Sequence, residues 1–168
     1  MKIAIITIGP QGAGKSWYSE ERIAENPDWD YVSRDQIMKE LLGPDCMGFN
    51  PYTNEHLYVF KEMWERVAAA AAGECSALIL DCFNMGSAGR KNLCEKLRLA
   101  GFGIIIGWQF ITPMKLAVDQ LIRRGGGESW TRSFMERDFK HYWEDLPKIE
   151  DGFDSLIEVD PRQLRLKI

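Results

Sequence analysis

The stretch that decides the fold is residues 2–16, which read KIAIITIGPQGAGKS. Residues 2–8 form an apolar run typical of a buried strand, and residues 9–16 match the phosphate-binding pattern G-x-x-x-x-G-K-[ST] at every fixed position. Glycines at 9, 12 and 14 permit backbone conformations closed to other residues, so successive N–H groups can turn toward a polyphosphate. The sequence therefore predicts a triphosphate-binding loop between a strand and a helix.

The residues that close this loop have separate expected roles. Lys15 reaches the β- and γ-phosphates, and the Ser16 hydroxyl ligates the Mg²⁺ that bridges them. Gly12, Ala13 and Gly14 supply backbone N–H groups, and the helix that starts at Lys15 directs the positive end of its dipole at the same anion. We therefore expect ATP and Mg²⁺ as cofactors, with these five residues in the ATP site.

The composition is that of an ordinary globular protein. The chain has 168 residues, of which 45% are hydrophobic and 27% are charged, so we expect one domain over residues 1–168. No apolar run approaches the roughly 20 residues of a membrane span, and no signal-peptide layout precedes the first strand. These features predict a cytoplasmic protein with no membrane partner.

Net charge bears on the kind of nucleic-acid contact to expect, and cysteine spacing bears on the state of the thiols. The net charge of −4 argues against binding long duplexes through many phosphates, so any nucleic-acid contact is expected to be local. The four cysteines, at 46, 75, 82 and 94, form no C-x-x-C pair, which favours reduced thiols over zinc ligands or disulfides.

Strand and helix patterns alternate along the chain. They predict an α/β fold in which a central, mostly parallel, five-stranded sheet is flanked by helices. The expected strands are 2–8, 31–32, 77–80, 102–111 and 155–159, and the expected helices are 15–25, 36–42, 55–72, 87–100, 113–124 and 131–145. In helix 55–72 the spacing predicts a buried face formed by Leu57, Phe60, Trp64, Val67 or Ala68, and Ala71.

Polar residues follow several of these strands, where ligands bind in open parallel sheets. Asp35 follows the short second strand, and a carboxylate there can take the proton from an attacking hydroxyl. Asp35 also stands directly before a predicted helix, so an N-cap explains it equally well. Arg34 is either a bidentate clamp for an acceptor phosphate or the partner of a surface acid.

Asp81 directly follows the expected strand 77–80. A carboxylate at this point is expected to hold the Mg²⁺ shell through water, whereas a turn former is the alternative interpretation. Asn84 is a weaker candidate for a polar contact to the acceptor or to a metal-bound water.

Arg123 and Arg124 precede Gly125, Gly126 and Gly127. This pattern is typical of a mobile lid that brings guanidinium charge onto the transferring phosphoryl group. A helix C-terminus favoured by cations before a glycine cap explains the same residues, and both interpretations can hold together.

Arg137, Lys140 and His141 share one face of the predicted helix 131–145, with Arg132 near its start. A solvated face is the favoured interpretation. A track for a polyanionic acceptor is the alternative.

The chain resembles the kinase domain of bacteriophage-type polynucleotide 5′-kinases, a group of P-loop kinases. The resemblance rests on Thr7-Ile8-Gly9, on residues 12–16, and on Ile23-Ala24, Asn26-Pro27 and Arg34-Asp35. Further along, Asp81 with Asn84 resembles the family's segment after the third strand, although Asn84 is one residue out of register. Pro113 followed by Arg124-Gly125 resembles its lid.

That resemblance implies specific roles. Asp35 would be the general base that activates a 5′-hydroxyl, Lys15 and Ser16 would serve the ATP phosphates, and Arg124 would be the catalytic lid arginine. The family's acceptor-binding arginine is replaced by Met38 here, with Lys39 beside it. The acceptor contacts are therefore expected from Arg34, Lys39, Asp81 and Asn84, in a phage-infected or bacterial cell.

The leading hypothesis is ATP-dependent phosphoryl transfer to a nucleic-acid hydroxyl, first of all the 5′-hydroxyl of DNA or RNA. One alternative is a phage DNA kinase that acts on hydroxymethylated bases, such as hydroxymethyluracil in DNA. Another is a small-molecule kinase for a nucleoside, nucleotide or sugar. The non-enzymatic alternative is a nucleotide-binding switch in which Asp35 is only a cap.

Overall fold

The fold is a parallel sheet with helices on both faces. The computed structural model describes residues 1–44, 54–82, 86–124 and 128–165. Its elements are, in chain order, β1 (Ile3–Ile8), α1 (Lys15–Glu25), β2 (Trp29–Ser33), α2 (Arg34–Leu42), α3 (Asn54–Ala72), β3 (Ala77–Asp81), α4 (Ser87–Ala100), β4 (Ile104–Phe110), α5 (Met114–Arg123), α6 (Glu128–Glu144), the short 3-10 helix η2 (Ile149–Asp151), β5 (Ser155–Val159) and α7 (Arg162–Arg165).

The five strands lie in the order β2-β3-β1-β4-β5, and every neighbouring pair is parallel. The first strand is therefore central, with Ile6 opposite Leu80 of β3 on one side and opposite Gly107 of β4 on the other. Because both faces of such a sheet are covered, its strands are continuously apolar, as residues 3–8 are. This arrangement confirms the predicted α/β class and brings the carboxyl ends of all five strands to one edge.

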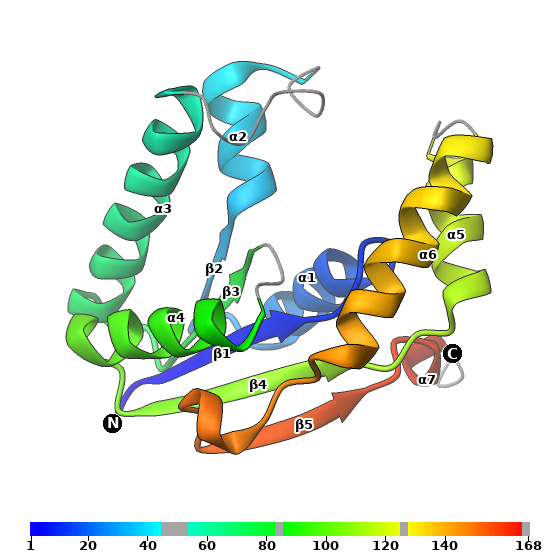
Figure 1. Cartoon of the computed structure of the whole chain (residues 1–168). Helices are drawn as coiled ribbons and strands as arrows, with labels where there is room; N and C mark the ends of the chain where they lie inside the picture. Colours follow the sequence, from blue (N-terminus) through cyan, green and yellow to red (C-terminus); the bar gives the residue numbers. More distant parts are fainter. Residues whose placement is uncertain (45–53, 83–85, 125–127, 166–168) are drawn as a thin grey trace.

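Two pairs of helices rise from that edge, as Figure 1 shows. Helix α2 stands over the end of β2, and α3 runs back from there to the amino-terminal edge of the sheet, where the Lys2 ammonium donates to the Ala70 and Ala71 carbonyls. The pair α5–α6 stands over the end of β4. The second pair has a small core of its own, formed by Ala117 and Val118 of α5 with Met135 and Phe139 of α6. Lys15, Ser16 and Asp81 lie at the edge of the sheet between these two pairs, whereas Arg123 and Arg124 lie at the far end of α5.

Helix α3 buries a stripe one residue away from the predicted one. Val67 is almost fully buried, as predicted, but it is joined by Val59 and Met63, whereas Leu57 is 67% exposed, contrary to prediction. Phe60 and Trp64 pack only at the margin of the core. The pattern contains two overlapping apolar stripes, and the position of α3 against α2 and α4 selects the stripe that faces the sheet.

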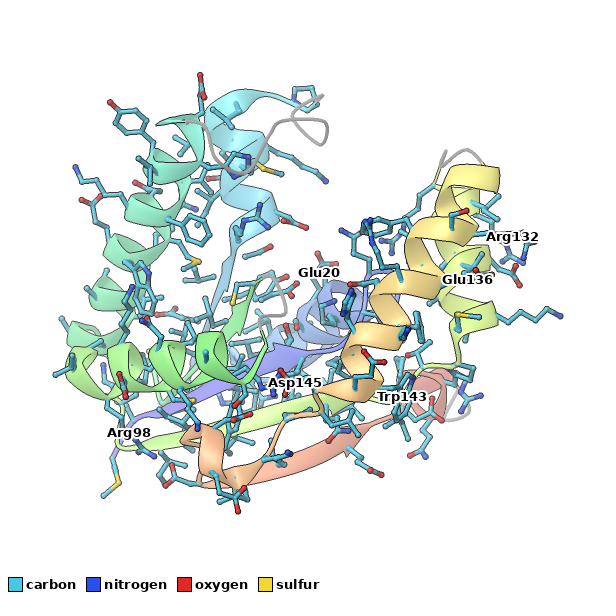
Figure 2. The ribbon with its side chains drawn as sticks, in the orientation of Figure 1. Glu20, Arg98, Arg132, Glu136, Trp143 and Asp145 are labelled. Atoms are coloured by element: carbon cyan, nitrogen blue, oxygen red, sulfur yellow. The ribbon has the colours of Figure 1, made fainter. Side chains whose placement is uncertain are left out.

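A buried ion-pair network ties the base of α6 to α4. Arg90 of α4, 4% exposed, lies 2.6 Å from the equally buried Asp151 and 3.1 Å from Asp145 at the end of α6. Asp145 also accepts a hydrogen bond from the backbone N–H of Ser87 at the start of α4, and Figure 2 labels it there. The network fixes the root of the α5–α6 pair relative to the sheet.

Replacing Arg90 with alanine should therefore cost about 3 kcal/mol of unfolding free energy, because it leaves the buried Asp151 carboxylate without its cation. Arg66→Ala is the matched control, since its pair with Glu40 is exposed and contributes at most about 1 kcal/mol. Urea unfolding of both variants makes the comparison. Equal losses in the two variants would show that the buried network is not a major source of stability.

Two expectations from composition can be compared with the structure. Cys75, Cys82 and Cys94 are free thiols, as predicted, and Cys46 lies outside the described residues. Within the described ranges, no helix combines the length and the apolar character that a membrane crossing requires.

Candidate active site at the carboxyl ends of the strands

The phosphate-binding loop has the backbone that its glycines predict. Gly12 and Gly14 have φ angles of 72° and 89°, in the left-handed region that disfavours side chains. A Cβ at position 12 would also lie 2.5 Å from the carbonyl oxygen of Ala117. Both the backbone conformation and this close approach therefore require glycine at position 12. The Thr112 hydroxyl donates to the Ala13 carbonyl at 2.7 Å and holds the loop against the segment after β4.

Lys15 lies across the loop that it closes. Its Nζ donates to the carbonyl oxygens of Gly9 and Pro10 at 2.8 and 2.9 Å. Burial lowers the pKa of Lys15, while the charges of Asp81 and, to a smaller extent, Asp138 oppose that shift. The ammonium group is thus placed at the mouth of the loop, where it fits a polyphosphate.

Asp81 is the polar centre of the site. Its carboxylate accepts hydrogen bonds from Thr7 at 2.7 Å, Ser16 at 2.6 Å and Tyr31 at 3.1 Å, and the residue is 7% exposed. Asp81 is the last residue of β3 and its partners come from β1, α1 and β2, which argues against the turn-former interpretation. Burial, followed by the charge of Asp81, raises the pKa of Tyr31, so this phenol remains a neutral donor.

The pair formed by Ser16 and Asp81 fits a magnesium ion. Hydroxyl, carboxylate and phosphate oxygens are the ligands that Mg²⁺ prefers, and the ion usually keeps several waters. The 2.6 Å contact places the hydroxyl and the carboxylate side by side at the first turn of α1. Ser16 is therefore suited to direct ligation and Asp81 to contact through water.

Asp35 does not cap helix α2. Ser33 is the N-cap residue, and its hydroxyl accepts from the Gln36 backbone N–H at 3.3 Å. Asp35 lies in the first turn of α2 with its side chain 58% exposed. Its negative charge opposes the lowering of the Lys15 pKa, to a smaller extent than Asp81 and Asp138 do. The capping interpretation is thus wrong, and the carboxylate of Asp35 is exposed to solvent.

Arg34 is mostly buried next to Asp35. Its side chain is 14% exposed, with a guanidinium nitrogen 3.5 Å from the Asp35 carboxylate. The guanidinium carbon lies 5.7 Å from the centre of the Phe60 ring, and the buried Nε has no hydrogen-bond partner among the described residues. Such a cation has unused donor capacity for an anion.

The other residues considered for acceptor binding are Lys39 and Asn84, together with Met38 at the position of the family's arginine. Lys39 is exposed one turn further along α2, while Met38 is 4% exposed and packs in the main core. Met38 therefore does not take the place of an acceptor-binding arginine. Asn84 lies outside the described residues.

Arg123 and Arg124 line a cavity of about 250 Å³ beside the loop. Arg124 also ends α5, since its backbone N–H donates to the Gln120 and Leu121 carbonyls, so the helix-end and lid interpretations are compatible. The cavity is completed by Gly14, Trp17, Gln120 and Pro161. Trp17 and Gln120 were not predicted, and Gly125–Gly127 lie outside the described residues.

Helix α6 contributes an acid to the loop. The Asp138 carboxylate accepts the Gln11 backbone N–H at 3.2 Å. By contrast, Arg137, Lys140 and His141 are exposed, and Figure 2 places Arg132 on the side of α6 turned away from the α2–α3 pair. This agrees with the solvated face favoured from the sequence.

Comparison with known proteins gives a family and a fold. Residues 5–137 match the family described as an AAA domain, whereas no curated protein matches. A fungal RNA kinase superposes with a TM-score of 0.62 at 16% identity, covering 94% of this chain and 74% of that chain. The Pnkp1/Rnl/Hen1 RNA repair complex gives 0.66 at 17%, covering 85% and 46% respectively.

A sugar kinase from Janibacter sp. HTCC2649 gives a TM-score of 0.62 at 16% identity, covering 99% of this chain and 92% of that chain. Likeness at this level of identity shows that the fold is shared. Because the family match spans well over half of the sequence, the chain belongs to the AAA domain family.

Proposed function

We propose that the protein is an ATP-dependent kinase that transfers the γ-phosphoryl group to a hydroxyl of a nucleic acid, first of all the 5′-hydroxyl of DNA or RNA. The observation that carries the proposal is the position of Asp35. Ser33 caps the helix, so Asp35 has no capping role, and its exposed carboxylate lies 3.5 Å from the Arg34 guanidinium and within electrostatic range of Lys15. A carboxylate there is suited to accept a proton from an attacking hydroxyl.

The donor side is assigned to the loop and its neighbours. Gly12, Ala13 and Gly14 would bind phosphate oxygens through backbone N–H groups, and Lys15 would neutralise charge on the transferred group. Mg²⁺, when bound with ATP, bridges the phosphates and offsets their negative charge. Ser16 and Asp81 would hold that ion, and the Thr7 and Tyr31 hydroxyls orient the Asp81 carboxylate.

The second part of the ATP site is the cavity lined by Arg123 and Arg124. Its volume of about 250 Å³ and its place next to Gly14 suit the base and sugar of a nucleotide whose phosphates lie in the loop. The planar guanidinium of Arg124 is suited to bind the transferring phosphoryl group bidentately. Its exposure leaves it able to reach that group.

On the acceptor side, Arg34 is the residue best placed to hold a phosphate of the strand. Its mostly buried guanidinium adjoins Asp35. A phosphate bound by Arg34 would therefore bring a neighbouring hydroxyl of the strand close to the Asp35 carboxylate. Lys39 would add a more distant, exposed charge. This arrangement supports a polyanionic acceptor over a neutral one.

A small-molecule kinase is the second candidate, since the same fold occurs in a protein named as a sugar kinase. A kinase for hydroxymethylated bases in DNA would use the same donor side with a different acceptor. One experiment separates these functions: transfer from γ-labelled ATP to 5′-hydroxyl DNA, 5′-hydroxyl RNA, hydroxymethyluracil duplex, nucleosides and sugars. Our proposal expects label in a 5′-hydroxyl strand, and labelling of nucleosides or sugars alone would contradict it.

A further inference from the structure

A small pocket of about 70 Å³ lies between α3 and α4, outside the residues assigned above. Facing stripes of the two helices form it. Helix α3 contributes Phe60, Met63 and Trp64, and helix α4 contributes Gly89, Asn92 and Lys96. The residues on each helix are spaced by three and four positions, so they share one face.

The pocket adjoins the acceptor side of the site. Phe60 is one of its walls and also carries the Arg34 guanidinium over its ring. Cys82, which directly follows Asp81, lines it as well.

Its lining has the chemistry that recognises an aromatic heterocycle. Two aromatic side chains line it, Phe60 with the Arg34 guanidinium over its ring and Trp64 with the Lys96 ammonium, and the exposed Asn92 amide offers both a donor and an acceptor. The Lys96 ammonium lies 5.2 Å from the centre of the Trp64 ring and gives this end of the pocket a positive charge. The volume is about twice that of one water in the liquid, so the pocket receives the edge of a ring while the remainder lies in its mouth.

We propose that this pocket binds the nucleobase of the acceptor nucleotide that carries the reacting hydroxyl. The proposal rests on the proposed function, because it needs a nucleic-acid acceptor. Arg34 would then hold a phosphate of the strand while the rings of Phe60 and Trp64 hold the base, and the hydroxyl would lie between them and Asp35.

The test compares two kinds of acceptor strand, one with a normal 5′-terminal nucleotide and one with an abasic 5′ end. For the wild-type protein we expect kcat/KM to favour the normal strand about tenfold, the scale of one base stacked on an aromatic side chain. Gly89→Met would fill the pocket from α4 and should abolish this preference. Gly89→Ala is the matched control, since both changes favour the helix but alanine leaves the pocket open.

The KM for ATP reports on the donor site and should change by less than about twofold in either variant, because the pocket does not touch the loop. If Gly89→Met does not fold, Asn92→Trp blocks the mouth from an exposed position on the same helix face. A base preference that persists in the blocked variant, or its absence in the wild type, would overturn the pocket proposal alone. Failure of the wild type to label any strand would overturn the proposed function together with it.

Discussion

Asp35→Asn is expected to lower kcat for phosphoryl transfer by about 10²–10⁴-fold, the range that a positioned general base contributes. The amide has nearly the same shape but cannot accept the proton that the hydroxyl loses. Because Ser33 caps α2, the substitution removes no cap, and the loss of the Asp35 charge from the first turn should cost at most about 1 kcal/mol of stability. ATP binding, measured by calorimetry, should change by less than about twofold.

Glu40→Gln is the matched control for this experiment. It also neutralises an acid on α2, but Glu40 lies near the other end of the helix and pairs with the exposed Arg66. Its kcat should stay near that of the wild type. Transfer that survives Asp35→Asn undiminished would remove Asp35 from the reaction and favour the nucleotide-binding switch.

Lys15→Met is expected to lower kcat/KM for ATP by about 10²–10³-fold, the loss typical of removing one preorganised donor to developing charge. Methionine keeps most of the side-chain length and apolar stem while removing the ammonium. Among the described residues, the Lys15 ammonium donates hydrogen bonds only to the Gly9 and Pro10 carbonyls. It can therefore turn to phosphate oxygens when a nucleotide binds. The charge and not the packing is therefore what the variant loses.

Lys61→Met serves as its control, because Lys61 is 72% exposed and makes a weak pair with Glu65 at 3.7 Å. Steady-state kinetics and thermal unfolding should be recorded for both variants. A Lys15→Met protein that folds and retains wild-type kcat/KM would contradict the assignment of the loop to a triphosphate.

Local patterns were sufficient to predict the fold. The strand and loop of residues 2–16 combine an apolar run with fixed glycines, and both signals act within a few residues of each other. The stripe of α3 shows the limit of such patterns. Leu57 and Val59 are equally apolar, and only packing against other helices decides which of the two is buried.

The sequence predicted those site residues that belong to a local motif. It did not predict the residues that join the site through contacts between distant parts of the chain. Lys15, Ser16 and Asp81 follow recognisable strand ends, but Tyr31 meets Asp81 across 50 residues. Trp17 of α1 and Gln120 of α5 line one cavity although about a hundred positions separate them in the sequence. No local pattern specifies either contact.

The residues around Asp35 contain a local signal that separates its two interpretations. Ser33-Arg34-Asp35-Gln36 has the S-x-x-Q spacing of a capping box, which assigns the cap to Ser33. That spacing alone argues against Asp35 as the cap, in agreement with the hydrogen bond that Ser33 accepts from Gln36. The roles of Asn84 and of the three glycines after Arg124 remain predictions.

The central claim is that a phosphoryl group leaves ATP and forms a bond to a nucleic-acid hydroxyl near Asp35. The most direct measurement is a single-turnover reaction of the wild-type protein with γ-labelled ATP, Mg²⁺ and a 5′-hydroxyl oligonucleotide, with the product located by mass spectrometry. We predict one added phosphate on the 5′-terminal nucleotide, formed at a rate that falls with Asp35→Asn. Release of the label as free phosphate, with the oligonucleotide unchanged, would contradict the claim.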